Sequence, residues 1–183
     1  MKKIYLSTTN KGKLKEFSEI LDLPLVAVNI DVDEVQSMDL EYVSRKKAEA
    51  AFEKVKKPVI VDDVGVYFEA WNGFPGPFIK FLNESVGYDG ISRMLDSVSK
   101  KMRAVDAISY HDGKKIHTFI GEFNGTIVER RGENGFGFDP IVMPDGYSMT
   151  FAEMDPADKH KISHRGRALA KFKNFLDGSQ KSK

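Results

Sequence analysis

Apolar and polar stretches alternate along the first sixty residues in a way that predicts strands and helices in turn. A short apolar run at residues 4–6 gives way to polar residues, and apolar side chains then recur at helical spacing at Leu14, Phe17, Ile20 and Leu21. Residues 24–30 read as a second strand, residues 40–55 carry one apolar stripe of a helix, and residues 59–61 form a buried strand. This strand is expected to carry Asp62 and Asp63 at its tip, where open α/β sheets place their ligands.

The second half of the chain predicts more strand than helix. Residues 71–77 hold too much Gly and Pro for the interior of an element, so we expect a structured turn before helices at about 78–86 and 90–98. Alternation over residues 102–110, the Asp112-Gly113 pair and a β-rich run at 115–123 predict a hairpin. Further strands are expected at 126–128 and 141–143, followed by a basic helix at 158–176 that ends at Gly178 and a frayed end at 179–183. No repeat or break in composition divides the chain, so we expect one domain over residues 1–183.

Composition and charge exclude several classes of protein. A chain of 183 residues can bury a sizeable core by itself. Its 28 Lys and Arg against 27 Asp and Glu leave a net charge of +1, without the wide positive field of a protein that tracks duplex DNA, so we expect a small anionic ligand and no nucleic acid. The chain has no cysteine, which rules out disulfides, a thiolate nucleophile and Cys-ligated zinc. Without a signal-peptide core or a run of ~18 apolar residues, it is expected to be cytoplasmic and to have no membrane partner.

The turn after the first strand is a candidate phosphate site. In Thr9-Asn10-Lys11-Gly12-Lys13 the chain leaves a strand and begins a helix, so free backbone N–H groups and the positive helix end point into the turn. An ordinary N-cap at Asn10 or Thr9 beside solvated lysines would give the same sequence. A Walker loop is excluded because Leu14 stands where that motif has Ser or Thr, and no glycine precedes Gly12 by five residues.

Acidic residues make a candidate metal site. Two carboxylates at one strand end repel each other unless a cation lies between them, so we prefer a Mg²⁺ site at Asp62-Asp63 over simple capping. The acidic stretch at 31–41 would, by itself, fit a solvated loop. The spacing does not match the D-x-D of phosphoaspartate phosphatases, and the G-x-S-x-G of serine hydrolases is absent.

A third segment could hold a planar base. Gly135-Phe136-Gly137-Phe138-Asp139 alternates small and aromatic residues, which lets backbone come close while a ring stacks on a flat ligand, although a core role fits either Phe alone. Farther on, Arg165 could read a base edge with its planar fork of donors. Phosphate, metal and base sites together indicate a nucleoside triphosphate.

In their order along the chain, these motifs resemble the inosine triphosphate pyrophosphatase family over nearly the whole sequence. The resemblance implies Mg²⁺-dependent (or Mn²⁺-dependent) hydrolysis of ITP, dITP and XTP between the α- and β-phosphorus, giving the monophosphate and pyrophosphate. It also implies an α/β fold with an elongated mixed β-sheet flanked by helices, two lobes around a central nucleotide cleft, and a homodimer. The matching residues are Thr8-Thr9-Asn10-Lys11-Gly12-Lys13-Leu14-Lys15-Glu16, Val59-Ile60-Val61-Asp62-Asp63 with Gly65, Asn72-Gly73-Phe74-Pro75-Gly76-Pro77, Phe136-Gly137-Phe138-Asp139-Pro140, Thr150-Phe151-Ala152-Glu153-Met154, and Lys159 with Ile162-Ser163-His164-Arg165.

The same resemblance assigns roles by position. Asp63 is the catalytic base or metal ligand, and Glu34 completes the metal site. The phosphates are assigned to Thr8, Thr9, Asn10, Lys11, Gly12, Lys13 and Lys47, the last chosen over Lys46 because its distance to Asp63 fits and it lies nearer the apolar stripe. The base is assigned to Phe136, Gly137, Phe138, Asp139, Lys159, Ser163, His164 and Arg165.

One position departs from the family pattern, and two other functions stay open. The family usually has Ser or Thr where this chain has Val64, so only the backbone N–H of Val64 is expected to contact substrate. A related pyrophosphatase with another base preference, such as a modified pyrimidine, would keep the metal and phosphate residues. A non-catalytic nucleotide sensor would bind the triphosphate and release no pyrophosphate.

Overall fold

The computed structural model describes residues 3–181 and the side chains of residues 3–178. The helices are α1 (Lys11–Leu21), α2 (Leu40–Val55), α3 (Ile79–Met94), α4 (Pro156–Ile162) and α5 (His164–Lys181), with short 3₁₀ turns η1 (Glu69–Trp71), η2 (Asp139–Ile141) and η3 (Phe151–Glu153). The strands are β1 (Ile4–Ser7), β2 (Leu25–Val28), β3 (Val59–Phe68), β4 (Pro75–Gly76), β5 (Lys101–His111), β6 (Ile116–Ile127) and β7 (Val142–Pro144). Within this range no helix has both the length and the apolarity needed to cross a bilayer.

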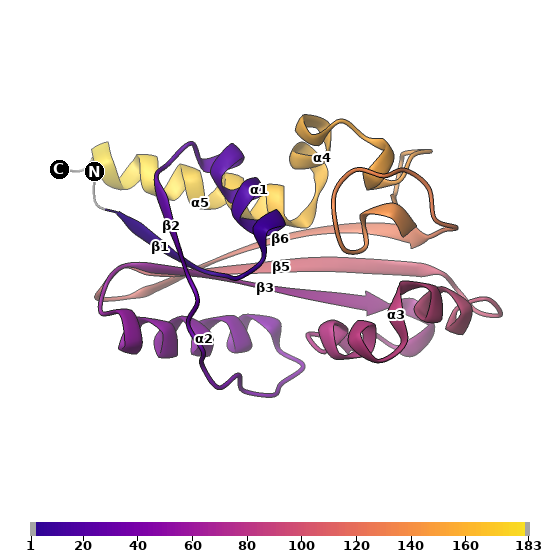
Figure 1. The fold of residues 1–183 in the computed structure, drawn as a ribbon, viewed down its shortest axis with the longest axis horizontal. Coiled ribbons are helices and arrows are strands. Elements are labelled where there is room, and N and C mark those ends of the chain that lie inside the picture. The colour runs from indigo at the N-terminus through magenta and orange to yellow at the C-terminus, as the bar shows by residue number, and fades with distance from the viewer. Residues whose placement is uncertain (1–2, 182–183) are drawn as a thin grey trace.

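The strands form one mixed sheet that gives the molecule its length. In the described residues seven strands join in the order β2-β1-β3-β5-β6-β7, with β4 paired to β3. β1 runs parallel to β2 and to the start of β3, whereas β3, β5 and β6 pair antiparallel along their length. Figure 1 shows these three strands running the length of the molecule, with α2 and α3 on one side and α1, α5 and α4 on the other. The elongated mixed α/β fold expected from the sequence is confirmed.

Of the four apolar clusters among the described residues, the two largest lie at the two ends of the long strands. One packs α1 and α5 on the sheet around Leu6, Phe17 and Phe172. The other packs α3 and the chain after β6 around Phe68, Ile91 and Phe151. The middle of β3 lies between these cores, so the polar residues there sit between two lobes.

Strand β3 is longer than the sequence indicated, and Asp62 and Asp63 lie in its middle rather than at its tip. The polar pair suggested an end, but β5 continues to pair with β3 in register, with Asp62 opposite Ile108 and Asp63 opposite Ala107. β1 does end here, because its last pair with β3 is Leu6 with Ile60. The carboxyl end of β1 therefore opens beside Asp62 and Asp63.

Three other boundaries also differ from the prediction. The two helices expected at 78–86 and 90–98 are present as the two segments of α3, which is broken at Gly87, whose φ of 69° and ψ of 173° are non-helical. The second segment ends at Met94 and not at residue 98. The strand expected at 126–128 is the end of β6, which runs without a turn through Asn124-Gly125 because β5 and β7 pair with it on both sides.

The single helix expected at 158–176 is two helices that meet at Ser163. There ψ is 156°, and the Ser163 hydroxyl accepts a hydrogen bond from the Gly166 N–H at 3.1 Å, as an N-cap does. The second helix continues past Gly178 to Lys181, and residues 182–183 of the expected frayed end lie outside the described residues.

Candidate functional site

A cleft of about 720 Å³ opens between the two lobes, and most of the predicted site residues line it. It brings the turn after β1, the middle of β3, α2, the glycine-rich loop and the start of α5 to one place. Of the predicted residues, the lining includes Thr8, Thr9, Asn10, Lys13, Glu34, Lys47, Asp63, Val64, Phe136, Gly137, Phe138, Asp139, Lys159, Ser163, His164 and Arg165. Lys11 and Gly12 are not among the lining residues.

The turn after β1 is a capped helix start. The Asn10 side chain accepts hydrogen bonds from the backbone N–H groups of Gly12 at 2.8 Å and Lys13 at 3.1 Å. Two donors that a phosphate could use are thus already bound, as the N-cap interpretation requires. The ammonium of Lys13 lines the cleft and pairs with the carboxylate and the backbone carbonyl of Asp62.

Gly12, which the resemblance assigns to the phosphates, leaves room for the ring of Phe136 in this structure. A Cβ at this position would lie 2.6–3.0 Å from ring carbons of Phe136, so only glycine lets that ring pack on the first turn of α1. The ring also lies 5.1 Å from the Lys159 ammonium and 5.8 Å from the Arg165 guanidinium. The segments predicted for phosphate and for base are therefore in direct contact.

Asp62 is the centre of a buried ionic network on the face of the sheet that α1 and α5 cover. Its two oxygens accept hydrogen bonds from Arg165 Nε at 2.9 Å and Nη2 at 3.2 Å. Arg165 Nη1 also donates to Glu16 at 2.8 Å, so the guanidinium joins α1, β3 and α5. Burial opposes the charge of Asp62, but Arg165 and Lys13 outweigh it and hold its pKa well below the usual range. The Arg165 guanidinium thus pairs with the carboxylates of Asp62 and Glu16. Its contact with a base edge stays a prediction.

Asp63 faces the opposite side of the sheet, because successive residues of a strand point to opposite faces. The Lys47 ammonium of α2 lies 2.7 Å from Asp63 Oδ1 and 2.5 Å from Glu34 Oε1. The other oxygen, Oδ2, is buried and has no hydrogen-bond partner within the described part of the chain. Burial raises the pKa of Asp63 above its ordinary value, although Lys47 acts to lower it.

Asp62 and Asp63 are not placed to share one cation, as the sequence suggested, because their side chains lie on opposite faces of the sheet. Asp62 pairs with the ammonium of Lys13 and Asp63 with that of Lys47. Glu34 and Asp63 do meet, around Lys47. Among residues 3–178 no group of three or more His, Asp or Glu side chains is arranged to hold a metal ion. Two carboxylates with one bare oxygen fit a Mg²⁺ site that phosphate oxygens and water would complete.

The glycine-rich loop is held by Asp139 and Lys159. Asp139 Oδ2 accepts hydrogen bonds from the Phe136 N–H and the Lys159 ammonium, both at 2.7 Å, and Lys159 also pairs with Glu16 at 2.7 Å. Burial raises the pKa of Asp139, although Lys159 acts to lower it. In the structure as it stands, these two predicted base-binding residues hold the loop against α1.

Phe138 and His164 make mainly ring contacts. The Phe138 ring packs edge to face on Tyr88 of α3, with centroids 4.7 Å apart. His164 is partly buried, and its ring lies 5.5 Å from that of Phe123. Its Nδ1 is buried and has no hydrogen-bond partner among the described residues. Burial lowers the pKa of His164 well below its usual value, so the ring is neutral and can offer one acceptor and one donor.

Sequence reasoning missed Glu16, Asp106 and the α3 side chains that line the cleft, among them Lys80 and Tyr88. Glu16 belongs to the first matching motif, but no role was assigned to it. Asp106 did leave a signal, because it interrupts the apolar row Met102, Ala104, Ile108 and Tyr110 on one face of β5. The α3 residues have no comparable signal.

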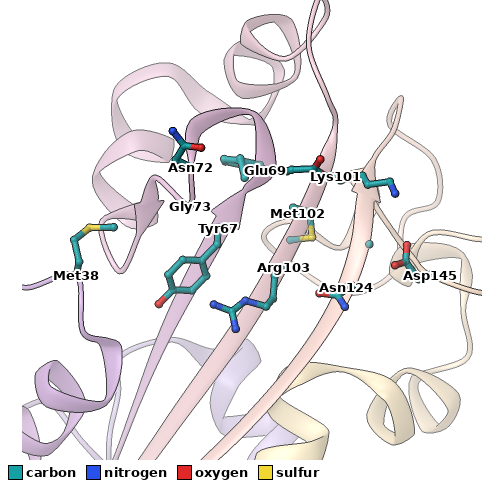
Figure 2. A pocket seen from close by; sticks show the side chains of 12 residues that line it. Met38, Tyr67, Glu69, Asn72, Gly73, Lys101, Met102, Arg103, Asn124 and Asp145 are labelled. Atoms are coloured by element: carbon teal, nitrogen blue, oxygen red, sulfur yellow. The ribbon is translucent and has the colours of Figure 1, made fainter.

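A second hollow of about 590 Å³ lies near the far end of the long strands and contains no predicted site residue. Figure 2 shows Tyr67 and Arg103 along its floor and Met38 at its rim. The Arg103 guanidinium lies over the Tyr67 ring at 4.9 Å and pairs with Glu122 at 3.2 Å. The guanidinium of Arg103 in this hollow is thus already paired with an acid.

Comparisons with known proteins agree with this geometry. The dITP/XTP pyrophosphatase of Saccharolobus solfataricus is 41% identical over 180 residues, covering 96% of this chain and 94% of that protein. The inosine triphosphate pyrophosphatase of Kluyveromyces lactis is 40% identical over 184 residues, covering 94% of this chain and 95% of that protein. The structure of the Staphylococcus aureus Ham1 protein superposes with a TM-score of 0.83 at 29% identity, over 97% of this chain and 100% of that one. The model of the Ham1 family matches residues 4–175, and the chain therefore belongs to the Ham1 family.

Proposed function

We propose that this protein hydrolyses noncanonical purine nucleoside triphosphates, ITP, dITP and XTP, to the monophosphate and pyrophosphate. The observation that carries the proposal is the single cleft in which the acids of β3, the lysines of α1 and α2 and the aromatic loop at Phe136 meet. The names of the relatives at 40–41% identity, dITP/XTP pyrophosphatase and inosine triphosphate pyrophosphatase, support the same activity.

Asp63 is the group proposed to act on water. Its bare oxygen Oδ2 can accept a hydrogen bond from a water molecule and orient it toward the α-phosphorus. The raised pKa of this carboxyl brings it closer to the range of an effective proton acceptor at neutral pH. The ammonium groups of Lys13 and Lys47, both on the cleft wall, can neutralise the departing pyrophosphate.

Mg²⁺, or Mn²⁺ in its place, is the proposed cofactor. Asp63 and Glu34 would hold it, and when bound it would supply positive charge to the phosphate oxygens. The support is that the two predicted acids meet on the cleft wall and one keeps an unpartnered oxygen.

Base selection is proposed to depend on hydrogen-bond donors aimed at the purine 6-position. Hypoxanthine and xanthine present an oxo acceptor there, whereas adenine presents an amino donor that would remain unmatched. Neutral His164 lines the cleft between the aromatic loop and α5 and has ring nitrogens available for such a contact. Guanine shares the oxo group, so its exclusion requires crowding near its 2-amino group.

Side-by-side hydrolysis of ITP, XTP, dITP, GTP and ATP, with pyrophosphate measured, tests the proposal. We expect the first three to be hydrolysed at least about a hundredfold more efficiently than ATP, as unmatched polar groups require. Equal efficiency on all would refute selective removal of noncanonical purines. A modified pyrimidine triphosphate as best substrate would favour the other base preference, and binding without release of pyrophosphate would favour a sensor.

A homodimer in the cytoplasm, where nucleoside triphosphates are made and used, is also proposed. The support for a dimer is exposed apolar surface: Met38, which lines the second hollow, and Phe74, which follows Gly73 of that hollow in the chain, are each 50% exposed. Sedimentation at micromolar concentration should give twice the mass of 20.6 kDa, and a monomer would refute it.

A further inference from the structure

Asp106 is a buried acid for which the proposed reaction has no use. It lies in the middle of β5, opposite Val64 of β3 and Gly121 of β6, and is 0% exposed. Neither of its oxygens has a hydrogen-bond partner among the residues that the structure describes. Its nearest cationic partner is Arg165, whose Nε lies 3.5 Å from Oδ2.

The donors around Asp106 are already engaged by other acids. Charged groups act on it from three neighbouring elements: Asp62 from β3, Arg165 from α5 and Lys13 from α1. Glu16 lies beyond Arg165, and His164 precedes Arg165 on α5. Arg165 gives its shorter bonds to Asp62 and Glu16, and Lys13 pairs with Asp62. Asp106 is left with the longest and weakest contact.

The charges of this network balance only if Asp106 is neutral. Three cations, Lys13, Arg165 and Lys159, are paired with three acids, Asp62, Glu16 and Asp139. An ionised Asp106 would add a fourth negative charge without a hydrogen-bond donor in a fully buried place, which is strongly unfavourable. A proton on Asp106 removes that charge and creates an O–H donor beside the Asp62 carboxylate. Burial and the neighbouring Asp62 both raise the pKa of Asp106 well above its ordinary value.

We propose that Asp106 is a positioning residue that works as a neutral carboxylic acid and donates a hydrogen bond to Asp62. The added donor helps to hold Asp62 between Lys13 and Arg165, and the neutral form places no extra negative charge under the phosphate end of the cleft. Because Lys13 lines that end, the consequence for substrate rests on the proposed hydrolysis. Loss of the proton as the pH rises would weaken binding of a triphosphate and raise KM, with a smaller effect on kcat.

Folding stability tests the protonation without reference to activity. In the folded state Asp106 keeps its proton above the ordinary pKa of 3.8, whereas in the unfolded state it loses it. The folded state then binds more protons, so the contribution of Asp106 to stability falls as pH rises from 3.8 to its folded pKa. In Asp106→Asn, which keeps a donor and cannot ionise, this loss is absent. The unfolding constant of the wild type relative to the variant should grow by up to about tenfold per pH unit over that window.

The matched control is Asp106→Leu, which removes both charge and donor. It should show the same pH trend relative to the wild type as Asp106→Asn, with lower stability than Asp106→Asn at every pH because Asp62 loses its donor. The slope with pH decides the test, since any cost of repacking shifts a variant by the same amount at every pH. If the ratio of the unfolding constants of wild type and Asp106→Asn stays constant above pH 5, and Asp106→Asn is the less stable protein, then Asp106 is ionised and paired with Arg165. That result would overturn the proposal.

Kinetics test the positioning role. As the pH rises through the folded pKa of Asp106, the KM of the wild type for ITP should rise, while the KM of Asp106→Asn stays flatter and kcat changes in parallel in both. Parallel KM profiles alongside the expected stability slope would overturn the positioning role and leave a structural one. If the wild type hydrolyses no purine triphosphate, the proposed function fails, whereas the stability slope still decides whether Asp106 is neutral.

Discussion

The two faces of β3 treat adjacent, chemically identical acids in opposite ways. On the face under α1 and α5, Asp62 is surrounded by Arg165 and Lys13, and its pKa is lowered. On the face over α2, Asp63 shares Lys47 with Glu34, and one of its oxygens has no hydrogen-bond partner among the residues that the structure describes. Its pKa is raised.

The difference shows how a fold divides structure from chemistry within two residues. A carboxylate with all its oxygens paired is stable but has no free lone pair for a substrate or water. A carboxylate with one bare oxygen costs stability and remains available to react. Asp62 therefore holds α1, β3 and α5 together, and the contrast supports the proposal that Asp63 takes part in the reaction.

The largest expected effect is on the stability of the Asp62 face. Asp62→Asn removes the charge between Lys13 and Arg165 and leaves two buried cations without their partner. Breaking such a network typically costs about 3–5 kcal/mol, which for a chain of this size lowers Tm by about 10 °C. Thermal unfolding measures it, with Asp63→Asn as the matched control. The control should stay within a few degrees of the wild type, because burial already disfavours the ionised form of Asp63. Similar decreases in Tm for Asp62→Asn and Asp63→Asn would contradict the difference between the two faces of β3.

The next effect is on turnover and belongs to the Asp63 face. Asp63→Asn should lower kcat for ITP by at least about a hundredfold, because the group that orients or deprotonates water is gone. Initial rates of pyrophosphate release measure it, and Asp33→Asn, an exposed acid near Glu34, should leave the rate unchanged. Near-normal turnover in Asp63→Asn would disprove the assigned role.

A smaller effect should depend on pH and comes from Glu16. Burial disfavours its charge, but Arg165 and Lys159 lower its pKa below the ordinary 4.5. A lowered folded pKa contributes stability above pH 4.5, and that contribution is lost as pH falls below 4.5 toward the folded value. Glu16→Gln should therefore be less stable by about 1.5–3 kcal/mol at pH 7, a difference that shrinks in acid.

Denaturant unfolding between pH 3 and pH 7 measures this trend. The control on the same helix is Glu19→Gln, because the Glu19 side chain is itself 42% exposed, unlike that of Glu16. A Glu16→Gln deficit that is the same at every pH would contradict the ionic role. The expected trend is opposite in sign to that of Asp106 in the same network.

The smallest effect is expected at Val64, which lines the cleft beside the two acids. Val64→Thr supplies the hydroxyl that the family pattern has here, and one hydrogen bond contributes about 0.5–1.5 kcal/mol. The kcat/KM for ITP should rise no more than several-fold. A change of a hundredfold would mean that the hydroxyl is part of the chemistry and that Val64 impairs it.

The elements that depend on local pattern were predictable from the sequence. The Asn10 cap and the apolar spacing of α1, the stripe of α2, and the Asp112-Gly113 turn between β5 and β6 all appear where expected. The ordered motifs also identified the family. Errors arose where tertiary pairing overrides a local signal, as in β3, which β5 carries past two acids, and at Ser163, where the chain stops one helix and caps the next.

By itself, the sequence determined most of the residues that gather at the cleft, because motif order and hydrophobic period are properties of the chain. Only the tertiary structure decided what each of them does there. Asp62 and Asp63 are chemically identical neighbours in the sequence. Strand register and the packing of α1, α2 and α5 place two cations beside Asp62 and leave one oxygen of Asp63 without a partner among the described residues. The reason is physical. The charge state of an acid, and the number of its oxygens left without a hydrogen bond, depend on burial and on neighbours in space, and the position of the acid along the chain does not fix them.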